Sequence, residues 1–289
     1  MAAGDLFADE ATASLEIVQA ECLAWLATVP DGAFQLVYVD PPFNTGRRRT
    51  LSRLRTTADP AGDRTGFGGR RYRTEMVGRH EYSDSYADYL AFLGPRLAAA
   101  IRVLDATGSL FVHLDPRESH HVKVHLDSVL GRERFMNEII WAYDYGARSR
   151  RRWPAKHDVI LWYARDPERY TFRYEEIDRI PYLAPQLAGE EKAKRGKTPT
   201  DVWWNTIVSP TGRERTGWPT QKPLAIVERI VRVHSNPGDR VLDFFAGSGT
   251  TGEAAVRHGR SCVLVDESPE AVDVMAARLA FAHPRLRRP

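Results

Sequence analysis

Apolar positions along the chain follow two spacings, one typical of strands and one typical of helices. Short runs rich in β-branched and aromatic residues predict strands at 34–39, 109–114, 139–141, 158–163, 240–244 and 261–265. Apolar residues three and four positions apart predict helices at 86–104, 118–130, 223–234, 252–258 and 269–282, and residues 14–29 predict a strand followed by a helix. Because the two kinds of element alternate, we expect an α/β fold: a doubly wound, mainly parallel sheet with helices on both faces.

Two long segments and the C-terminal tail lack this pattern. Residues 47–80 carry many arginines and few acidic residues, and glycines at 62, 66, 68 and 69 argue against regular structure, so we expect a mobile basic loop. Residues 165–215 are polar and irregular, and the tail 285–289 is predicted to be frayed. The chain is therefore expected to divide into 1–164, an irregular insertion at 165–215, and 216–289.

The composition indicates a soluble protein with an ample core. Hydrophobic residues make up 43% of the chain and charged residues 27%, and the formal net charge of +3 is a weak indication of a polyanionic partner. The two cysteines, Cys22 and Cys262, exclude a disulfide framework. Residues 1–10 lack the features of a signal peptide, and no apolar run is long enough to span a membrane. We therefore expect a cytoplasmic protein.

A glycine-rich turn follows the predicted strand 240–244. Gly247 and Gly249 permit close approach of a ligand to the backbone, and the next helix presents free N–H groups. Asp266 ends the following strand, where a carboxylate suits a ribose diol. The Gly-x-Gly-x-x-Gly spacing also fits a dinucleotide-binding turn, and a tight turn without a ligand is a third interpretation. Asp243 favours a cationic ligand group, because its carboxylate would repel a pyrophosphate.

This turn resembles the S-adenosylmethionine loop of amino-methyltransferases, in which an acidic residue ends the strand and Phe-x-Gly-x-Gly follows. The resemblance implies S-adenosylmethionine as the cofactor and Asp266 as the residue that holds its ribose, although the family often has Glu at that position. The cofactor-binding residues implied for the loop are Asp243, Phe245, Ala246, Gly247, Ser248, Gly249 and Thr250.

The tetrapeptide Asp40-Pro41-Pro42-Phe43 follows the predicted strand 34–39. The prolines fix the backbone, so the Asp40 carboxylate and the Pro41 carbonyl can present two hydrogen-bond acceptors from a rigid loop. Two acceptors suit an exocyclic amino group, because engaging its N–H bonds frees a lone pair that is otherwise delocalised into the ring. Phe43 offers a face on which a base can stack, worth about 1–3 kcal/mol. The alternative is a Pro-Pro turn capped by Asp40, without chemistry.

Residues 36–46 resemble the catalytic motif of DNA amino-methyltransferases over their whole length. The resemblance implies catalytic roles for Asp40, Pro41, Pro42 and Phe43 on a base that is flipped out of the duplex. The catalytic motif precedes the cofactor loop, as in the permuted β group of these enzymes. In a Rossmann-like doubly wound sheet the two loops meet where the strand order reverses, at the carboxyl ends of the strands.

Residues 217–223 resemble a further signature of the β group. The resemblance places Thr220, Gln221 and Lys222 in the pocket for the methionine part of the cofactor. Considered without the resemblance, Thr220 is a helix cap in front of Pro223.

Asp40 also bears on the choice of base. The family tends to use Asp or Asn before the prolines for adenine N6 and Ser for cytosine N4, so adenine is favoured and cytosine N4 is the alternative. Two hypotheses come from other classes, an NAD-binding oxidoreductase and a DNA-binding module without catalytic activity.

Basic and aromatic side chains interleave between residues 141 and 174, a mixture that suits phosphate contacts beside stacked bases. Trp141, Trp162 and Tyr163 are expected in the core. The resemblance makes 165–215 the target-recognition region and double-stranded DNA the partner, with a homodimer and a cognate restriction endonuclease as further options. Candidate DNA-binding residues are Arg47, Arg48, Arg148, Arg150, Arg151, Arg152, Lys194 and Arg195.

Four histidines invite a comparison with metal sites. No carboxylate pattern of a zinc site accompanies them, so we expect no metal and a surface position for these side chains. They are His113, His120, His121 and His125.

Overall fold

The computed structural model describes residues 13–44, 47–62, 64–65, 69, 71–84, 86–146, 148–209 and 212–289. Residues 1–10, for which the sequence predicts no signal peptide, lie outside the described residues. In the part of the chain that the structure describes, no helix has the length and apolar character needed to cross a membrane.

A nine-stranded sheet in the order β12-β1-β11-β10-β2-β6-β8-β7-β9 forms the centre of the molecule. Neighbouring strands are parallel, except that β8 is antiparallel to both β6 and β7. The strands are β1 (Leu15–Gln19), β2 (Phe34–Val39), β6 (Leu104–Leu114), β7 (Phe135–Ala142), β8 (His157–Ala164), β9 (Val202–Trp204), β10 (Arg240–Asp243), β11 (Ser261–Asp266) and β12 (Arg285–Arg287).

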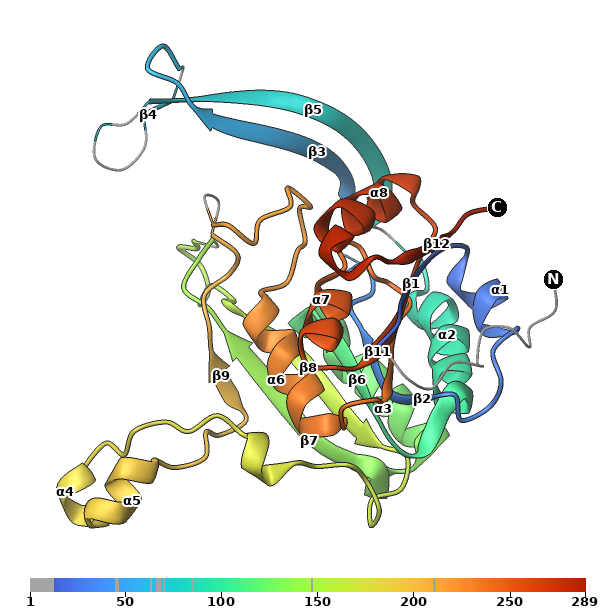
Figure 1. Cartoon of the computed structure of the whole chain (residues 1–289), viewed down its shortest axis with the longest axis vertical. Helices are drawn as coiled ribbons and strands as arrows, with labels where there is room; N and C mark the ends of the chain where they lie inside the picture. The colour runs from blue at the N-terminus through green and yellow to red at the C-terminus, as the bar shows by residue number, and fades with distance from the viewer. Residues whose placement is uncertain are drawn as a thin grey trace.

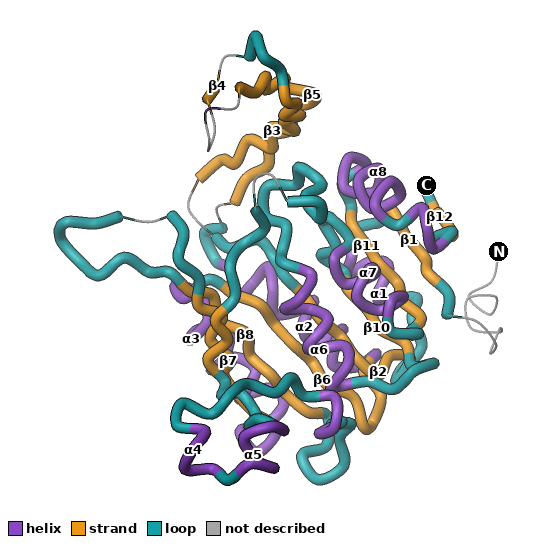
Figure 2. Tube along the Cα trace, turned by 60° about the vertical axis from the view of Figure 1, so that its left-hand side comes forward, coloured by secondary structure: helices purple, strands orange, loops and turns teal. Residues whose placement is uncertain are grey.

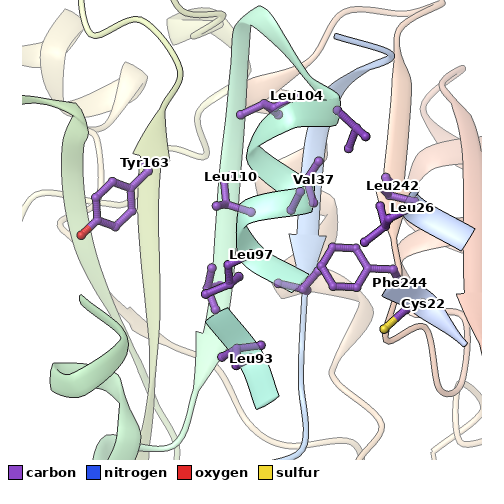
Figure 3. Close-up of a cluster of buried hydrophobic side chains, with 14 of the residues drawn as sticks. Cys22, Leu26, Val37, Leu93, Leu97, Leu104, Leu110, Tyr163, Leu242 and Phe244 are labelled. Atoms are coloured by element: carbon purple, nitrogen blue, oxygen red, sulfur yellow. The ribbon is translucent and has the colours of Figure 1, made fainter. Parts of the chain in front are cut away.

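Helices cover both faces of the sheet (Figure 1). One core packs α1 (Cys22–Leu26), α2 (Tyr89–Val103) and α3 (Pro116–Leu130) against the sheet, and Figure 3 shows part of it. The other core packs α6 (Leu224–His234), α7 (Thr250–Arg257) and α8 (Pro269–Arg278). Strand residues alternate between the two cores: Val37 of β2 faces the first, and Leu36 and Tyr38 face the second. The predicted doubly wound α/β fold is therefore confirmed.

Most long helices begin at a capping side chain. Asp88 accepts a hydrogen bond from the Ala91 N–H at 2.9 Å at the start of α2, and Ser268 accepts one from the Ala271 N–H at 3.2 Å at the start of α8. Helix α6 differs, because its Leu224 N–H donates to the Glu214 carboxylate at 3.1 Å. The prediction that Thr220 caps this helix is wrong, since Glu214 reaches the helix start from an earlier turn.

Strands β2 and β10 are direct neighbours, although they lie far apart in the sequence. Val241 pairs with Leu36 and Leu242 with Val37 in parallel register. From this pair the chain continues to β6 on one side and to β11 on the other, so the strand order reverses here. The loops that follow both strands therefore leave the sheet side by side, as the motif analysis predicts.

The expectation of a loop at 47–80 is wrong for most of its described residues. A second sheet, antiparallel and ordered β3-β5-β4, is formed by β3 (Arg47–Ala58), β4 (Arg64–Thr65) and β5 (Arg71–Asp84). Gly66 and Gly68 lie outside the described residues. Gly62 and Gly69 lie between strands, while Gly78 stands at a register shift in β5, so these glycines permit pairing. Paired strands also satisfy each other's backbone groups. Both views show this arm projecting from the body (Figures 1 and 2).

The tail and the insertion are more ordered than predicted. The tail contributes β12, whose Arg287 forms an ion pair with Glu16 of β1, so the expectation of a frayed end is wrong. The insertion contains α4 (Pro185–Ala188), α5 (Glu190–Arg195) and β9. Short 3-10 helices lie at Arg132–Arg134, Tyr174–Glu176 and Ala280–Ala282.

The antiparallel strand β8 determines where the insertion lies. Because β8 runs against β6, it ends at the sheet edge opposite the carboxyl ends of β2 and β10. The insertion therefore starts at that opposite edge. Both views place α4 and α5 at the end of the molecule opposite the β3–β5 arm (Figures 1 and 2).

Candidate active site

A cavity of about 500 Å³ lies at the carboxyl ends of β2, β10 and β11. Its lining joins the two motifs that the sequence separates. The predicted site residues in the lining are Asp40, Pro41, Pro42, Phe43, Thr220, Lys222, Asp243, Phe245, Ala246, Gly247, Ser248, Thr250 and Asp266. Gln221 and Gly249 are predicted cofactor-binding residues that do not line the cavity.

Both of these residues have structural contacts. The Gln221 side chain accepts a hydrogen bond from the Thr216 N–H at 2.8 Å and donates one to the Glu214 carbonyl at 2.6 Å, which fixes the turn before α6. Gly249 adopts a left-handed φ of 74°, and a Cβ there would lie 3.0 Å from Met275 of α8. Gly249 thus allows α8 to pack closely beneath the glycine loop.

Gly247 has the same backbone requirement and faces the cavity. Its φ is 47°, and a Cβ would lie 2.9 Å from the indole nitrogen of Trp218. Its N–H donates to Asp266 at 2.9 Å. The glycine loop is thereby held between the Trp218 ring and the end of β11.

Two carboxylates lie beside this loop. Asp243 is 3% exposed and accepts hydrogen bonds from Thr251 Oγ1 at 2.6 Å and from the Phe245 N–H at 3.0 Å. Burial raises the pKa of Asp243 to about 7 in spite of these bonds. Asp266 accepts from the Gly247 and Ser268 N–H groups, and burial raises its pKa to about 6. A bound cation or hydroxyl donor would favour the ionised form of both groups.

The catalytic tetrapeptide meets the cofactor side of the cavity through Lys222. The Lys222 ammonium contacts Asp40 Oδ2 and lies 4.6 Å from the centre of the Phe43 ring. Asp40 Oδ1 is buried and has no hydrogen-bond partner among the residues that the structure describes. The backbone oxygen of Lys222 accepts from Thr250 Oγ1 at 3.3 Å. One carboxylate oxygen of Asp40 is thus held by a cation, and the other is left for a ligand.

His113 is fully buried, so the expectation of a surface position is wrong for this histidine. Both ring nitrogens are satisfied, because Nδ1 lies 2.8 Å from the Tyr38 hydroxyl and Nε2 lies 3.1 Å from Asp158. Periodicity could not reveal this, since the partners come from two other strands, β2 and β8. Within the described ranges, no group of three His, Cys, Asp or Glu residues is arranged to hold a metal. Trp141, Trp162 and Tyr163 are buried, as predicted.

The predicted DNA contacts are not all at one place. The loop 143–156 follows β7, which runs in the same direction as β2, so it leaves the sheet at the cavity edge. Its exposed basic residues, without an ion pair in the part of the chain described here, are Arg148, Arg150, Arg151 and Arg152. The side chains of Arg47 and Arg48 lie outside the description, although their backbone starts β3. Lys194 and Arg195 lie on α5, at the opposite end of the molecule (Figure 2).

Several lining residues escaped the sequence analysis. Tyr86, which precedes α2, and Phe92 and Arg96 of α2 line the cavity, together with Glu21 and Cys22 at the start of α1. Arg96 forms an ion pair with Glu21 at 2.8 Å and contacts the Cys22 thiol at 3.2 Å. The helical spacing of these residues indicates core packing, and a single sequence carries no further signal. Trp218, by contrast, lies inside the 217–223 signature and could have been included.

The DNA methylase family model N6_N4_Mtase matches residues 34–278. Type II methyltransferase M.HpaI of Haemophilus parainfluenzae is 27% identical over 254 residues, which cover 88% of this chain and 70% of the relative. DNA adenine methyltransferase YhdJ of Escherichia coli (strain K12) is 26% identical over 92% of this chain and 83% of the relative.

Solved structures show the same fold. The cytosine-N4-specific PvuII DNA methyltransferase superposes with a TM-score of 0.64 at 16% identity, covering 92% of this chain and 87% of that one. The M1.HpyAVI complex with SAM gives a TM-score of 0.58 at 20% identity over 91% and 98% of the two chains.

Proposed function

Because the chain belongs to the DNA methylase family, we propose that it transfers the methyl group of S-adenosylmethionine to N6 of adenine in double-stranded DNA. The observation that carries this proposal is that Asp40 and the glycine loop line the same cavity. A methyl donor and an amine acceptor held in one cavity need mainly alignment, and positioning of this kind lowers an activation barrier by about 7–11 kcal/mol.

The cofactor side of the cavity fits S-adenosylmethionine. Asp266 uses one lone pair of each oxygen for a backbone N–H, and the remaining lone pairs suit the ribose hydroxyls. The buried Asp243 is suited to the ammonium of the methionine part. The Asp243 carboxylate beside the loop would repel a pyrophosphate, which argues against the NAD-binding alternative. When bound, the cofactor supplies a methyl group, which the amine nitrogen takes as the carbon–sulfur bond breaks and a proton leaves that nitrogen.

The Asp40 side of the cavity fits the acceptor amine. Oδ1 is buried and free to accept one amino N–H, and the Pro41 carbonyl is proposed to accept the other. Lys222 holds Oδ2, so the carboxylate cannot turn away from the substrate. Phe43 is proposed to stack on the flipped base, which would offset part of the cost of leaving the duplex.

Adenine is favoured over cytosine by Asp40 itself, because the family tends to place Ser before the prolines when cytosine N4 is the target. The relative YhdJ is named as an adenine methyltransferase, which agrees with this choice.

The DNA is proposed to lie along the cavity edge of the sheet, against the loop 143–156 and the β3–β5 arm. Of the target-recognition region 165–215, residues 205–215 follow β9, which is parallel to β7 and so ends at this edge. We propose that this part contacts the DNA near the cavity. We also propose a cytoplasmic location on the nucleoid, a homodimer, and a cognate restriction endonuclease as partner.

The test is to incubate the protein with unmethylated DNA and labelled S-adenosylmethionine, digest the DNA, and identify the nucleoside by mass spectrometry. We expect N6-methyl-2′-deoxyadenosine, and N4-methyl-2′-deoxycytidine would overturn the choice of base. Asp40→Ala should abolish labelling while cofactor binding persists. DNA binding without any labelled nucleoside in the wild type would instead support a module without catalytic activity.

A further inference from the structure

A chain of four polar side chains crosses the core behind the catalytic tetrapeptide. Tyr38 lies on β2, His113 on β6 and Asp158 on β8, and Tyr143 directly follows β7; these four strands are consecutive in the sheet. The Tyr38 hydroxyl lies 2.8 Å from His113 Nδ1, and His113 Nε2 lies 3.1 Å from Asp158 Oδ2. The Tyr143 hydroxyl donates to Asp158 Oδ1 at 3.0 Å. Tyr38, His113 and Asp158 are all buried.

The protons in this chain can be arranged so that every member is satisfied. Burial opposes ionisation of Asp158, but the hydrogen bond from His113 and the nearby Lys222 charge hold its pKa below the usual value. An ionised carboxylate only accepts, so His113 Nε2 and the Tyr143 hydroxyl both donate to it. With His113 neutral and its proton on Nε2, Nδ1 is an acceptor, and the Tyr38 hydroxyl donates to it. Each link therefore fixes the orientation of the next.

One end of the chain is part of the cavity wall. Tyr38 lines the cavity two residues before Asp40. The ring of Phe43, proposed above as the stacking face, lies 6.1 Å from the His113 ring, with 33° between the ring planes. Trp141 packs edge-on against His113 at 5.6 Å. The imidazole thus contacts both the proposed base-stacking ring and a residue near the end of β7.

The other end of the chain joins the two ends of the arginine-bearing loop 143–156. Tyr143 and Asp158 flank residues 144–157, and their side chains are joined by the hydrogen bond described above. The Tyr143 N–H also donates to the Lys156 carbonyl at 3.0 Å, and Lys156 forms an ion pair with Asp144 at 2.7 Å. The exposed arginines of this loop therefore lie beyond two end residues, Tyr143 and Asp158, that are connected to His113 through Asp158.

An ionised carboxylate in a core is costly, and apolar residues of the same shape are often as stable or more stable. What a satisfied polar network adds is a unique arrangement of the elements that it joins. Here those elements are the cavity wall and the arginine-bearing loop.

We propose that His113 is a positioning residue, and that the chain Tyr38–His113–Asp158–Tyr143 sets the position of the base-stacking wall relative to the loop that holds the DNA backbone. The inference rests on the proposed function, because it assigns the loop to DNA and Phe43 to the base. The flipped base and the phosphates beside it would then be held by one rigid frame, which keeps the amine in line with the methyl donor.

Single hydroxyl deletions test this with little risk to folding. The variants are Tyr38→Phe, Tyr143→Phe and the double variant, and the matched control is Tyr163→Phe. Tyr163 is a buried tyrosine on β8 whose hydroxyl also donates to a carboxylate, Asp127 at 2.7 Å, but it belongs to the other core. For each protein one measures kcat, KM for DNA, the Kd for S-adenosylmethionine, and the fluorescence of 2-aminopurine at the target position.

Each deletion near His113 should lower kcat about fivefold to tenfold, the factor expected for the net contribution of one hydrogen bond. KM for DNA and cofactor Kd should stay within about twofold, and Tyr163→Phe should leave kcat unchanged. Because both deletions interrupt the same chain, the double variant should be no slower than the slower single variant. The 2-aminopurine signal should show a base that is extruded but less firmly stacked.

Two results would overturn the proposal. One is an unchanged kcat in Tyr143→Phe. The other is a double variant whose loss is the product of the single losses, because independent effects mean that no chain connects the residues. The comparison of kcat uses whichever base the wild type methylates, so a wrong choice of base leaves it valid. A wild type that methylates no DNA would refute the proposed function before any variant is compared.

Discussion

The affinity for S-adenosylmethionine should increase as the pH rises from 5 to 7, and Asp266 should account for much of the change. Burial raises the pKa of Asp266 to about 6. The carboxylate is then about one-tenth ionised at pH 5 and about nine-tenths ionised at pH 7. Ribose hydroxyls donate hydrogen bonds to the ionised form, so binding is expected to be about tenfold tighter at pH 7 through this group alone.

Asp243 should add to the same trend, because burial raises its pKa to about 7 and an ammonium group favours its ionised form. The stability of the unliganded protein should change in the opposite direction. For an acid with a raised folded pKa, the stabilisation is complete below the unfolded pKa near 3.8 and is lost as the pH rises through the folded value. Without cofactor the protein should therefore lose stability between about pH 4 and pH 7, and cofactor should protect it most at the upper end.

Isothermal titration calorimetry at pH 5, 6 and 7 measures the affinity for S-adenosylmethionine and the protons released on binding. Proton release appears as a dependence of the binding enthalpy on the ionisation enthalpy of the buffer. The matched variant is Asp266→Asn, which keeps the shape of the side chain and removes its titration. Its affinity should be weaker at pH 7 and should rise about tenfold less than that of the wild type over the same range. Equal pH dependence in the two proteins would refute the assignment of this titration to Asp266.

Three other changes have clear expected outcomes. Lys222→Met should lower the free energy of unfolding by about 3–5 kcal/mol, because the exposed fraction of the Lys222 side chain is only 8% and its removal leaves the Asp40 charge without its partner. It should also lower kcat with little change in cofactor Kd, and a large loss of cofactor affinity at constant kcat would instead make Lys222 a cofactor ligand. Replacing Arg148, Arg150 and Arg151 by Gln should reduce the slope of log K for DNA against log salt by about 3, at about 0.9 for each phosphate contact, and the same slope in the variant would exclude this loop from the interface. Phe43→Ala should weaken binding of 2-aminopurine DNA by about 1–3 kcal/mol in a fluorescence titration, and an unchanged affinity would show that the base does not stack there.

The sequence predicts the fold and the meeting of the two motifs because both depend on local signals. The strand that ends at Asp40 and the strand that ends at Asp243 are each marked by apolar runs and turn residues, and the switch-point rule for doubly wound sheets brings their loops together. What the sequence does not show is pairing between distant segments. The β3–β5 arm consists of strands whose partners are set by register, and its many arginines suggest a loop.

Pairing between distant segments also explains which contacts inside the site the sequence does not predict. Lys222 belongs to a recognisable signature, but its contact with Asp40 joins residues that only the β2–β10 pairing brings together. His113 lies in an apolar strand with no neighbouring acid in the sequence, and its partners become visible only when β2, β6 and β8 are aligned. Tertiary contacts of this kind carry no periodic signal, so one sequence cannot reveal them.

The central position of β2 has a consequence for the order in which the chain folds. Until residues 240–243 have been synthesised, β2 has a partner on one side only, and its other edge is open to pairing with foreign strands. The glycine-loop wall of the cavity cannot form before that late strand fills the gap. A nascent or truncated chain that already carries its arginines can therefore attach to nucleic acid, but it gains chemical competence only in the last stage of assembly.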